Sequence, residues 1–292
     1  GVFAMATGTS NTPAYSSGFI TDLTINRQPA SSEDWYIQSR LIGTKYLVTN
    51  DTNVEANDSN SKWDYNTGWY GSSQGSNYQA WMWKRHAGFD VVTYTGNGTA
   101  GHQIPHSLSK IPEMMWVKTR STSGKHWYVY HKGLNGGTNP EQYSIRLNVS
   151  NDEGTDSLSW NQTAPTSTHF TLGNSTQINI NNDNNIAMLF ASVDGISKVG
   201  YYDGSSSAQT ITTGFQPRFL LVKQINGANW WLILDTTRGW GSGNDQYLSP
   251  NETNAQASYD FGAPTSNGFS VPGVGNAAIN ASGSSFIYYA HA

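Results

Sequence analysis

Short runs in which apolar residues predominate recur along the chain and are separated by segments rich in Gly, Asn, Ser and Pro. Some of these runs begin with tryptophan, and each is preceded by a run of alternating or paired apolar residues. The tryptophan-led runs are 35–39, 127–131 and 231–235, and the runs before them are 23–27, 114–118 and 219–223. β-Branched and aromatic residues in runs of this length, bounded by turn residues, are typical of short strands.

The runs belong to three copies of one unit. Residues 46–56 reappear at 247–257 with six identical positions, and residues 164–170 reappear at 263–269. In the first copy only residues 67–69 resemble part of the segment shared by 164–170 and 263–269. We therefore place the units at residues 1–88, 89–196 and 197–292 and predict about six short strands in each. At roughly 100 residues, each unit is long enough to bury a small core of its own as a sandwich or barrel.

The predicted fold class is therefore all-β, with three tandem antiparallel β-sandwich-like repeat units. A pseudo-threefold arrangement of the units is an alternative to separate domains, and the sequence does not choose between them. Composition agrees with this fold class, because charged residues make up 12% of the chain and aromatic residues 13%. An ordinary soluble domain has roughly 25% charged residues. Few charges disfavour long surface helices, and many aromatic residues disfavour disorder.

Charge and composition also exclude several classes of partner. The net charge is −4 and the pI about 5.9, so no basic field attracts nucleic acid or anionic lipid. No apolar run approaches 18 residues, and the first residues lack the pattern of a signal peptide. The chain has no cysteine, which excludes disulfides and cysteine-bound zinc. We expect no nucleic-acid partner, no membrane insertion and no cofactor.

Two strings resemble catalytic or nucleotide-binding motifs. Residues 71–75 match the G-x-S-x-G elbow that exposes a nucleophile, here Ser73, between a strand and a helix. The string lies instead in a polar run between two predicted strands. Residues 96–101 match G-x-G-x-x-G, but no helical pattern follows to receive a phosphate, so a β-turn is expected. We therefore predict no catalytic residue.

Candidate metal ligands are equally sparse. His102 and His106 have the i,i+4 spacing of helical ligands, but Pro105 between them prevents the helix that would align the two rings. Residues 181–185 supply oxygen atoms but lack the carboxylates and the glycine of a calcium loop, and a solvated hairpin loop is expected there. We therefore predict no metal site.

Acidic residues give no catalytic pair by sequence alone. Glycoside hydrolysis needs two carboxyl groups about 5–10 Å apart. The acids in predicted loops are expected to be solvated, and they are Glu33, Asp34, Asp152, Glu153 and Asp156. Asp235 aligns with Ser39 and His131 in the other units. A position that varies while its strand persists is either a tolerant strand edge or a specialised site, and we favour the tolerant edge.

The repeats divide the tryptophans into two groups. Trp35, Trp127 and Trp231 recur at one position and are expected to pack in the core. Three others lie among Asp, Asn, Ser and Gly, and they are Trp63, Trp160 and Trp240. Their rings either cap the end of a sandwich or stack on a sugar. They are the candidate ligand-binding residues, with Trp240 the best candidate because the glycines around it cannot pack it locally.

The chain resembles a repeat domain of marine bacteriophage virion proteins that are described as tail-fibre-like. The residues that carry the resemblance are 104–108, 112–114 and 130–132, together with the repeated Ala-Pro-Thr-Ser segment. The first unit departs most, because Thr21 stands where the other units have Pro112 and Pro217, and Arg27 replaces a lysine. The resemblance covers nearly the whole chain.

The resemblance implies a non-enzymatic structural protein on the surface of a phage particle. We expect a tail-fibre or adhesion component, oligomeric and bound to other virion proteins, that contacts host-surface polysaccharide. A capsid decoration protein on the outside of the head is the alternative, and a polysaccharide-degrading enzyme is the third. Recognition is expected on loops that the units do not share: 57–63, 133–141 and 239–246.

Overall fold

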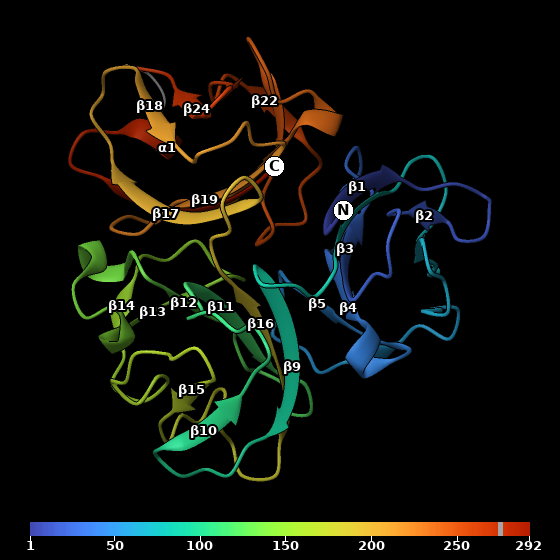
Figure 1. Ribbon diagram of the computed structural model, residues 1–292, viewed down its shortest axis with the longest axis vertical. Coiled ribbons are helices and arrows are strands. Elements are labelled where there is room, and N and C mark those ends of the chain that lie inside the picture. The colour runs from blue at the N-terminus through green and yellow to red at the C-terminus, as the bar shows by residue number, and fades with distance from the viewer. Residues whose placement is uncertain (274–276) are drawn as a thin grey trace.

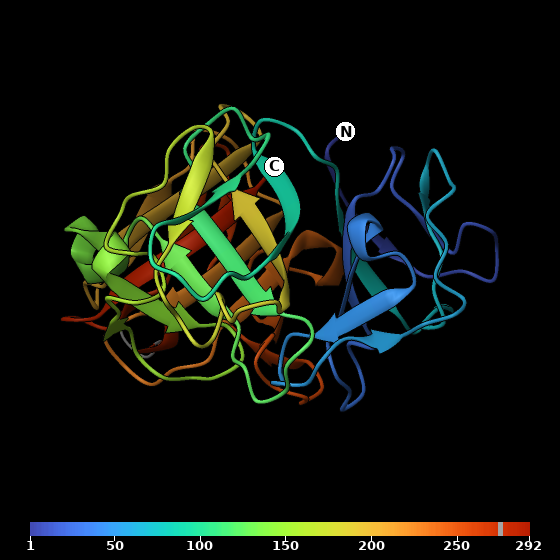
Figure 2. The ribbon, with the colours of Figure 1, turned by 90° about the horizontal axis from the view of Figure 1, so that it is seen from below.

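The computed structural model describes residues 1–273 and 277–292, and it is all-β. Three six-stranded antiparallel sheets are each paired with a small sheet, and the three pairs lie around a common centre (Figure 1). Each large sheet is built from the strands of one sequence unit. A view from below shows the second and third units overlapping, with the first unit beside them (Figure 2). The predicted fold class is confirmed.

The first unit contains a large sheet, a two-stranded sheet and the 3₁₀ turn η1 (Arg40–Ile42). The large sheet has the order β1 (Phe3–Thr7), β8 (Gln79–Trp83), β3 (Leu23–Arg27), β4 (Tyr36–Ser39), β5 (Lys45–Val48) and β6 (Ala56–Asn57). The small sheet pairs β2 (Tyr15–Ser16) with β7 (Gly68–Trp69).

The second unit repeats this order. Its large sheet runs β9 (Phe89–Thr95), β16 (Asn184–Phe190), β11 (Met114–Thr119), β12 (Tyr128–His131), β13 (Tyr143–Arg146) and β14 (Gly154–Thr155). Its small sheet pairs β10 (His102–Pro105) with β15 (His169–Leu172). The 3₁₀ turns η2 (Leu134–Gly137) and η3 (Pro140–Gln142) lie between β12 and β13.

The third unit has the same order again: β17 (Ser197–Asp203), β25 (Ser285–His291), β19 (Phe219–Gln224), β20 (Leu232–Asp235), β21 (Asp245–Leu248) and β22 (Ala257–Tyr259). Its small sheet has three strands, β18 (Gln209–Thr212), β24 (Gly268–Val271) and β23 (Pro264–Thr265). The 3₁₀ turn η4 (Thr236–Arg238) follows β20, and the short helix α1 (Ala277–Asn280) precedes β25. Within the described residues, no helix has the length and apolar character needed to cross a membrane.

Strand register confirms the equivalence of the units. Each small sheet pairs one residue of the first strand with an aromatic residue of its partner: Tyr15 with Trp69, Ile104 with Phe170, and Ile211 with Phe269. Residues 67–69 therefore correspond to 168–170 and 267–269, the ends of the repeated segments 164–170 and 263–269. The first unit retains the pairing geometry although it has lost most of the sequence.

Both faces of the large sheets are buried. In β19, Phe219 and Leu221 belong to a central cluster shared by all three units, whereas Leu220 and Val222 belong to the outer cluster of the third unit. The other units have outer clusters of the same kind. A strand buried on both faces has a nearly continuous apolar sequence, which explains the paired apolar residues seen in these runs. The units therefore form one pseudo-threefold body with a shared core.

The recurrent tryptophans join neighbouring units. All three are fully buried, and each indole nitrogen donates a hydrogen bond to a main-chain carbonyl of another unit. The three bonds are Trp127 to Val48 (2.8 Å), Trp231 to Arg146 (2.9 Å) and Trp35 to Ser249 (2.9 Å). The acceptors occupy equivalent positions, so the second unit contacts the first, the third contacts the second, and the first contacts the third. The three units close into a ring.

A buried cation lies on the third strand of each unit, at Arg27, Lys118 and Lys223. The Arg27 guanidinium donates to the main-chain carbonyls of Thr253 and Asn254 in the third unit, at 3.2 and 3.0 Å. Burial lowers the pKa of Lys118 and of Lys223 to about 8 and that of Arg27 to about 10. The expected equivalence of these three positions is confirmed.

Carboxylates of neighbouring units offset part of this burial penalty at the two lysines. Asp51 of the first unit raises the pKa of Lys118, and Asp152 of the second unit raises that of Lys223. Each ring junction therefore pairs a cation of one unit with anionic or carbonyl oxygen atoms of the preceding unit.

Candidate functional site

The three tryptophans predicted to bind sugar are buried. Trp63, Trp160 and Trp240 are 7%, 1% and 3% exposed, and each packs in the outer cluster of its own unit. Their indole nitrogens donate to carbonyls within the same unit, at Gly43, Tyr143 and Gly262. The loops that carry them fold back over the sandwich, so the rings cap its core and offer solvent no face for stacking. The alternative of a cap on the sandwich is the correct one, and the expected sugar contact is wrong.

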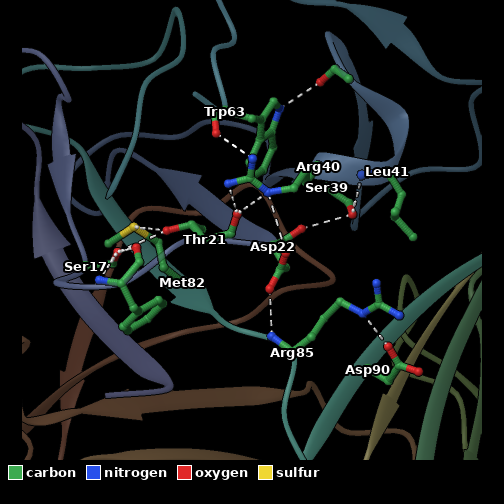
Figure 3. Close-up of polar contacts among 12 residues, drawn as sticks. Ser17, Thr21, Asp22, Ser39, Arg40, Leu41, Trp63, Met82, Arg85 and Asp90 are labelled. Carbon is green, nitrogen blue, oxygen red and sulfur yellow. Dashed lines mark hydrogen bonds and ion pairs between the residues drawn. The ribbon is translucent and has the colours of Figure 1, made fainter. Parts of the chain in front are cut away.

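The surroundings of Trp63 show how its ring is covered (Figure 3). The Arg40 guanidinium lies 5.7 Å from the ring centroid and donates to the Thr21 carbonyl at 2.9 Å. Arg40 also forms an ion pair with Asp22 at 3.5 Å. The other oxygen of Asp22 accepts the backbone N–H of Arg85, which leads into the second unit. Trp63 is therefore connected, through Arg40 and Asp22, to the segment that leaves the first unit.

Asp235 is fully buried, so the expectation of a tolerant strand edge is wrong. Ser39, His131 and Asp235 each accept a hydrogen bond from a backbone N–H of the following turn, at Leu41, Gly133 and Arg238. Three different side chains thus cap the same turn. Asp235 additionally accepts the indole N–H of Trp81 in the first unit at 3.1 Å, which adds a contact across the ring.

The strings that resemble enzyme motifs have structural roles. Residues 71–77 form bends and turns, and the Ser73 carbonyl accepts the Tyr15 hydroxyl at 2.6 Å, so the strand–turn–helix geometry of a nucleophile elbow is missing from this segment. Gly96 begins a tight turn after β9. A Cβ atom there would lie 2.2 Å from the Ile180 carbonyl oxygen, which explains the glycine.

The candidate metal ligands are likewise occupied. His102 contacts the Asn179 side chain at 2.9 Å, and His106 contacts the Thr166 carbonyl at 3.1 Å. Residues 181–183 form a turn before β16. Across residues 1–273 and 277–292, no group of three or more His, Cys, Asp or Glu side chains is arranged to hold a metal ion.

A polar groove lies in the second unit and is lined by residues of β13 and β14. Figure 1 shows these two strands at the edge of the unit's large sheet. It has a volume of about 380 Å³. The groove is bounded by strand residues and by the loops 151–159 and 175–177. The lining residues used below are Tyr128, Ser144, Arg146, Asp152, Glu153, Thr155, Asp156, Leu158 and Gln177.

Arg146 is the main hydrogen-bond donor in the groove. Its guanidinium lies 5.6 Å from the centroid of the Tyr128 ring, a cation–π distance. Among the contacts of the described chain, this guanidinium has neither a hydrogen bond nor an ion pair with a protein group. Its carbonyl accepts the Trp231 indole, so the ring junction fixes the main chain that carries it. The groove therefore contains a guanidinium whose N–H donors are free of protein acceptors within the described part of the chain.

Asp156 also lines the groove. Its Oδ1 accepts the backbone N–H groups of Leu158 at 3.0 Å and Ser159 at 2.9 Å. Its Oδ2 is buried and lacks a hydrogen-bond partner within the described part of the molecule. A buried carboxylate oxygen without a donor is energetically costly, so this atom favours a ligand that can donate to it.

The first unit has a counterpart groove of about 260 Å³ in which both features are lost. Asp58 corresponds to Asp156, since each donates its backbone N–H to a carbonyl before the fifth strand, at Thr44 and Gln142. The two oxygens of Asp58 accept hydrogen bonds from the backbone of Asn60 and of Ser72. Val48 stands where the second unit has Arg146.

The loop acids are more engaged than expected. Glu33 accepts the backbone N–H of Gln28 at 2.8 Å, and Asp34 accepts the Asn50 amide at 2.8 Å. Glu153 accepts the backbone N–H of Asn135 at 2.7 Å, and burial raises its pKa. Asp152 is exposed, as expected. The solvated interpretation is therefore wrong for Glu33, Asp34 and Glu153, which fix loops, and for Asp156, which accepts two backbone N–H groups.

Sequence reasoning did not single out Arg146 and Tyr128. Aligning the three units would have marked the arginine, because Val48 and Ser249 occupy its position in the other copies. Its approach to Tyr128 depends on strand register, because the two residues are direct partners in the β12–β13 pairing.

The fold defines an all-β protein of three sandwiches closed into a ring, and the groove of the second unit contains Arg146 and Asp156. The chain belongs to the family described as a domain of unknown function (DUF7483), whose model matches residues 7–292. The match spans all three units. Comparison with curated proteins and with solved structures gave no match.

Proposed function

We propose that this protein is a non-enzymatic structural protein of a bacteriophage particle, in a tail-fibre or adhesion component that contacts glycans on the host surface. The observation that carries the proposal is the guanidinium of Arg146, which lies over Tyr128 in a polar groove and has no hydrogen bond or ion pair with the protein among the described residues. The residues that the units share are used to build the ring. Recognition then falls to a feature that one unit has and the others lack.

The groove supports binding more than hydrolysis. A glycosidase needs one carboxyl group that gives a proton and a second that attacks the sugar or activates water. Glu153 has a raised pKa, but its carboxylate is bonded to the backbone of Asn135. Asp156 holds the backbone of Leu158 and Ser159. Both groups stabilise loops, which favours a passive site.

The unmatched loops differ in their suitability for contact. Residues 133–141 pack against the third unit, because Cβ atoms at Gly133 and Gly137 would lie 2.5 and 2.6 Å from atoms of Tyr201. Residues 57–63 and 239–246 end in or contain the buried Trp63 and Trp240. In our proposal the groove replaces these loops as the host contact, while the outer surface of the ring contacts other virion proteins and further copies of the chain.

The proposal is tested by locating the protein on the particle and by measuring attachment. Gold-labelled antibody should mark tail fibres in electron micrographs, and the purified protein should bind host cells and lose that binding after periodate treatment of the cell surface. Label confined to the head would favour a decoration protein. Release of reducing sugar from host polysaccharide would reject the non-enzymatic proposal.

A further inference from the structure

We propose that the groove of the second unit binds an uncharged hexopyranose residue, held by Arg146 and by Oδ2 of Asp156. This inference rests on the proposed function, since it names the class of ligand that the adhesion site would take. It goes further by assigning the contact to two chemical groups and by excluding charged sugars.

The size of the groove fits a small polar ligand. Its volume of about 380 Å³ lies at the lower end of the roughly 300–1,000 Å³ typical of small-molecule sites. One sugar ring, or a terminal ring with part of the next, fits such a volume. The groove is open at the surface of the second unit, so the remainder of a glycan chain can continue into solvent.

The two polar groups complement neighbouring hydroxyls of a pyranose. A guanidinium presents several N–H donors in a planar fork, which can bond two oxygen atoms side by side. Each hydroxyl also has a proton to donate, and Asp156 Oδ2 is a buried acceptor that lacks one. Ser144, Thr155 and Gln177 supply further hydroxyl and amide groups along the groove. A ligand rich in hydroxyls satisfies both kinds of group at once.

Charge decides between classes of sugar. The lining contains one guanidinium and three carboxylates, at Asp152, Glu153 and Asp156, and Asp152 also interacts with the buried Lys223. Their excess negative charge repels the carboxylate of a uronic or sialic acid. The guanidinium in turn repels an ammonium group at the position where it binds oxygen. Leu158, which is 49% exposed at the groove, offers an apolar surface for the C–H face of a ring.

The first unit provides a matched control. Its groove is smaller and contains Asp58, whose two oxygens are already bonded to the protein. The strand position that corresponds to Arg146 holds Val48. The variant Asp156→Asn keeps an Oδ1 acceptor for the turn but replaces the free acceptor with a donor. Asp58→Asn makes the same chemical change in the first unit, where no binding is expected.

The test is a titration of the whole protein with methyl pyranosides, followed by saturation-transfer NMR or calorimetry. The probes are neutral hexosides, an N-acetylhexosaminide, a uronide and a hexosaminide with a free amine. We expect at least one uncharged glycoside to bind most tightly. Arg146→Met and Asp156→Asn should each weaken it at least tenfold, Arg146→Lys should weaken it less than Arg146→Met, and Asp58→Asn should leave it unchanged. Thermal melts establish that each variant is folded.

Two results would overturn the inference: tightest binding of a charged glycoside, or equal affinity in the wild-type protein and Arg146→Met. Failure of the proposed function is separable. If Arg146→Met attaches to host cells as well as the wild type does, the groove is not the contact but adhesion stands. If the wild type binds glycosides but does not attach to cells, adhesion fails and the sugar site stands.

Discussion

The indole nitrogen of Trp127 donates to the Val48 carbonyl oxygen at 2.8 Å. A core residue of the second unit thus provides the hydrogen-bond donor for the carbonyl at the end of a strand of the first. Similar bonds run from the third unit to the second and from the first to the third. Together with the shared central cluster, they make the stability of each unit depend on its neighbours.

We therefore expect the chain to unfold in one cooperative transition. The central cluster contains residues of all three large sheets, and opening one unit would expose apolar surface of the other two. Differential scanning calorimetry should give a van't Hoff enthalpy close to the calorimetric enthalpy. Three resolved transitions, or a folded fragment of residues 89–196, would show that the units are independent.

Replacing Trp240 should be as costly as replacing a recurrent tryptophan. Trp127, Trp231 and Trp240 are all almost fully buried and hydrogen-bonded. Each change to alanine should lower the free energy of unfolding by about 3–5 kcal/mol. The sequence alone predicts a much smaller loss at Trp240. Denaturant titration of the three variants measures these losses. A loss of unfolding free energy below about 1 kcal/mol for Trp240→Ala would contradict the observed packing.

Acid should destabilise the protein through His131. Burial lowers the pKa of this fully buried side chain from 6.5 to about 3. Between those values the unfolded chain binds the proton and the folded chain does not, so stability falls as pH falls below 6.5. His131→Asn keeps an acceptor for the Gly133 N–H and removes the titration. Its unfolding free energy should therefore fall less steeply between pH 6.5 and 4 than that of the wild type. An identical slope would show that His131 is charged in the fold.

The buried lysines should make the fold more stable at mildly alkaline pH. The pKa of Lys118 is about 8 in the fold and near 10.5 when unfolded. From pH 8 upward the unfolded state holds more protons, so the contribution of Lys118 to the unfolding free energy rises with pH. Lys118→Met removes this rise and, as an apolar replacement, should be neutral or stabilising at pH 7. Denaturation at pH 8 and pH 9 measures the difference, because the tyrosines, whose pKa is near 10 when unfolded, contribute equally in both proteins. Equal slopes in both proteins would contradict it.

Much of the fold was predictable because the three copies act as an internal alignment. Runs such as 114–118 and 219–223 marked equivalent strands, and the cations within them marked equivalent junctions. The closure of the ring was not predictable. It depends on carbonyl groups, such as that of Arg146, and these main-chain groups leave no mark in the residue types.

The candidate site was predicted poorly, for a physical reason. Trp63, Trp160 and Trp240 lie in polar segments, and nothing local shows that those segments fold back over an apolar cluster. Asp235 illustrates a second difficulty. Its position changes in residue type among the copies, yet Ser39 and His131 perform the same capping there with different acceptor atoms. Variation in residue type concealed a constant role.

Phe3 and His291 stack with ring centroids 4.6 Å apart, so the first and last strands of the described chain meet inside the body (Figure 1). The order of the three units along the chain is therefore only one of three cyclic orders that would give the same contacts between units. A circular permutant that begins at residue 89, with residue 292 joined to residue 1 by a short linker, would contain every junction of the ring. The fold is defined by which unit contacts which, and not by which unit comes first along the chain.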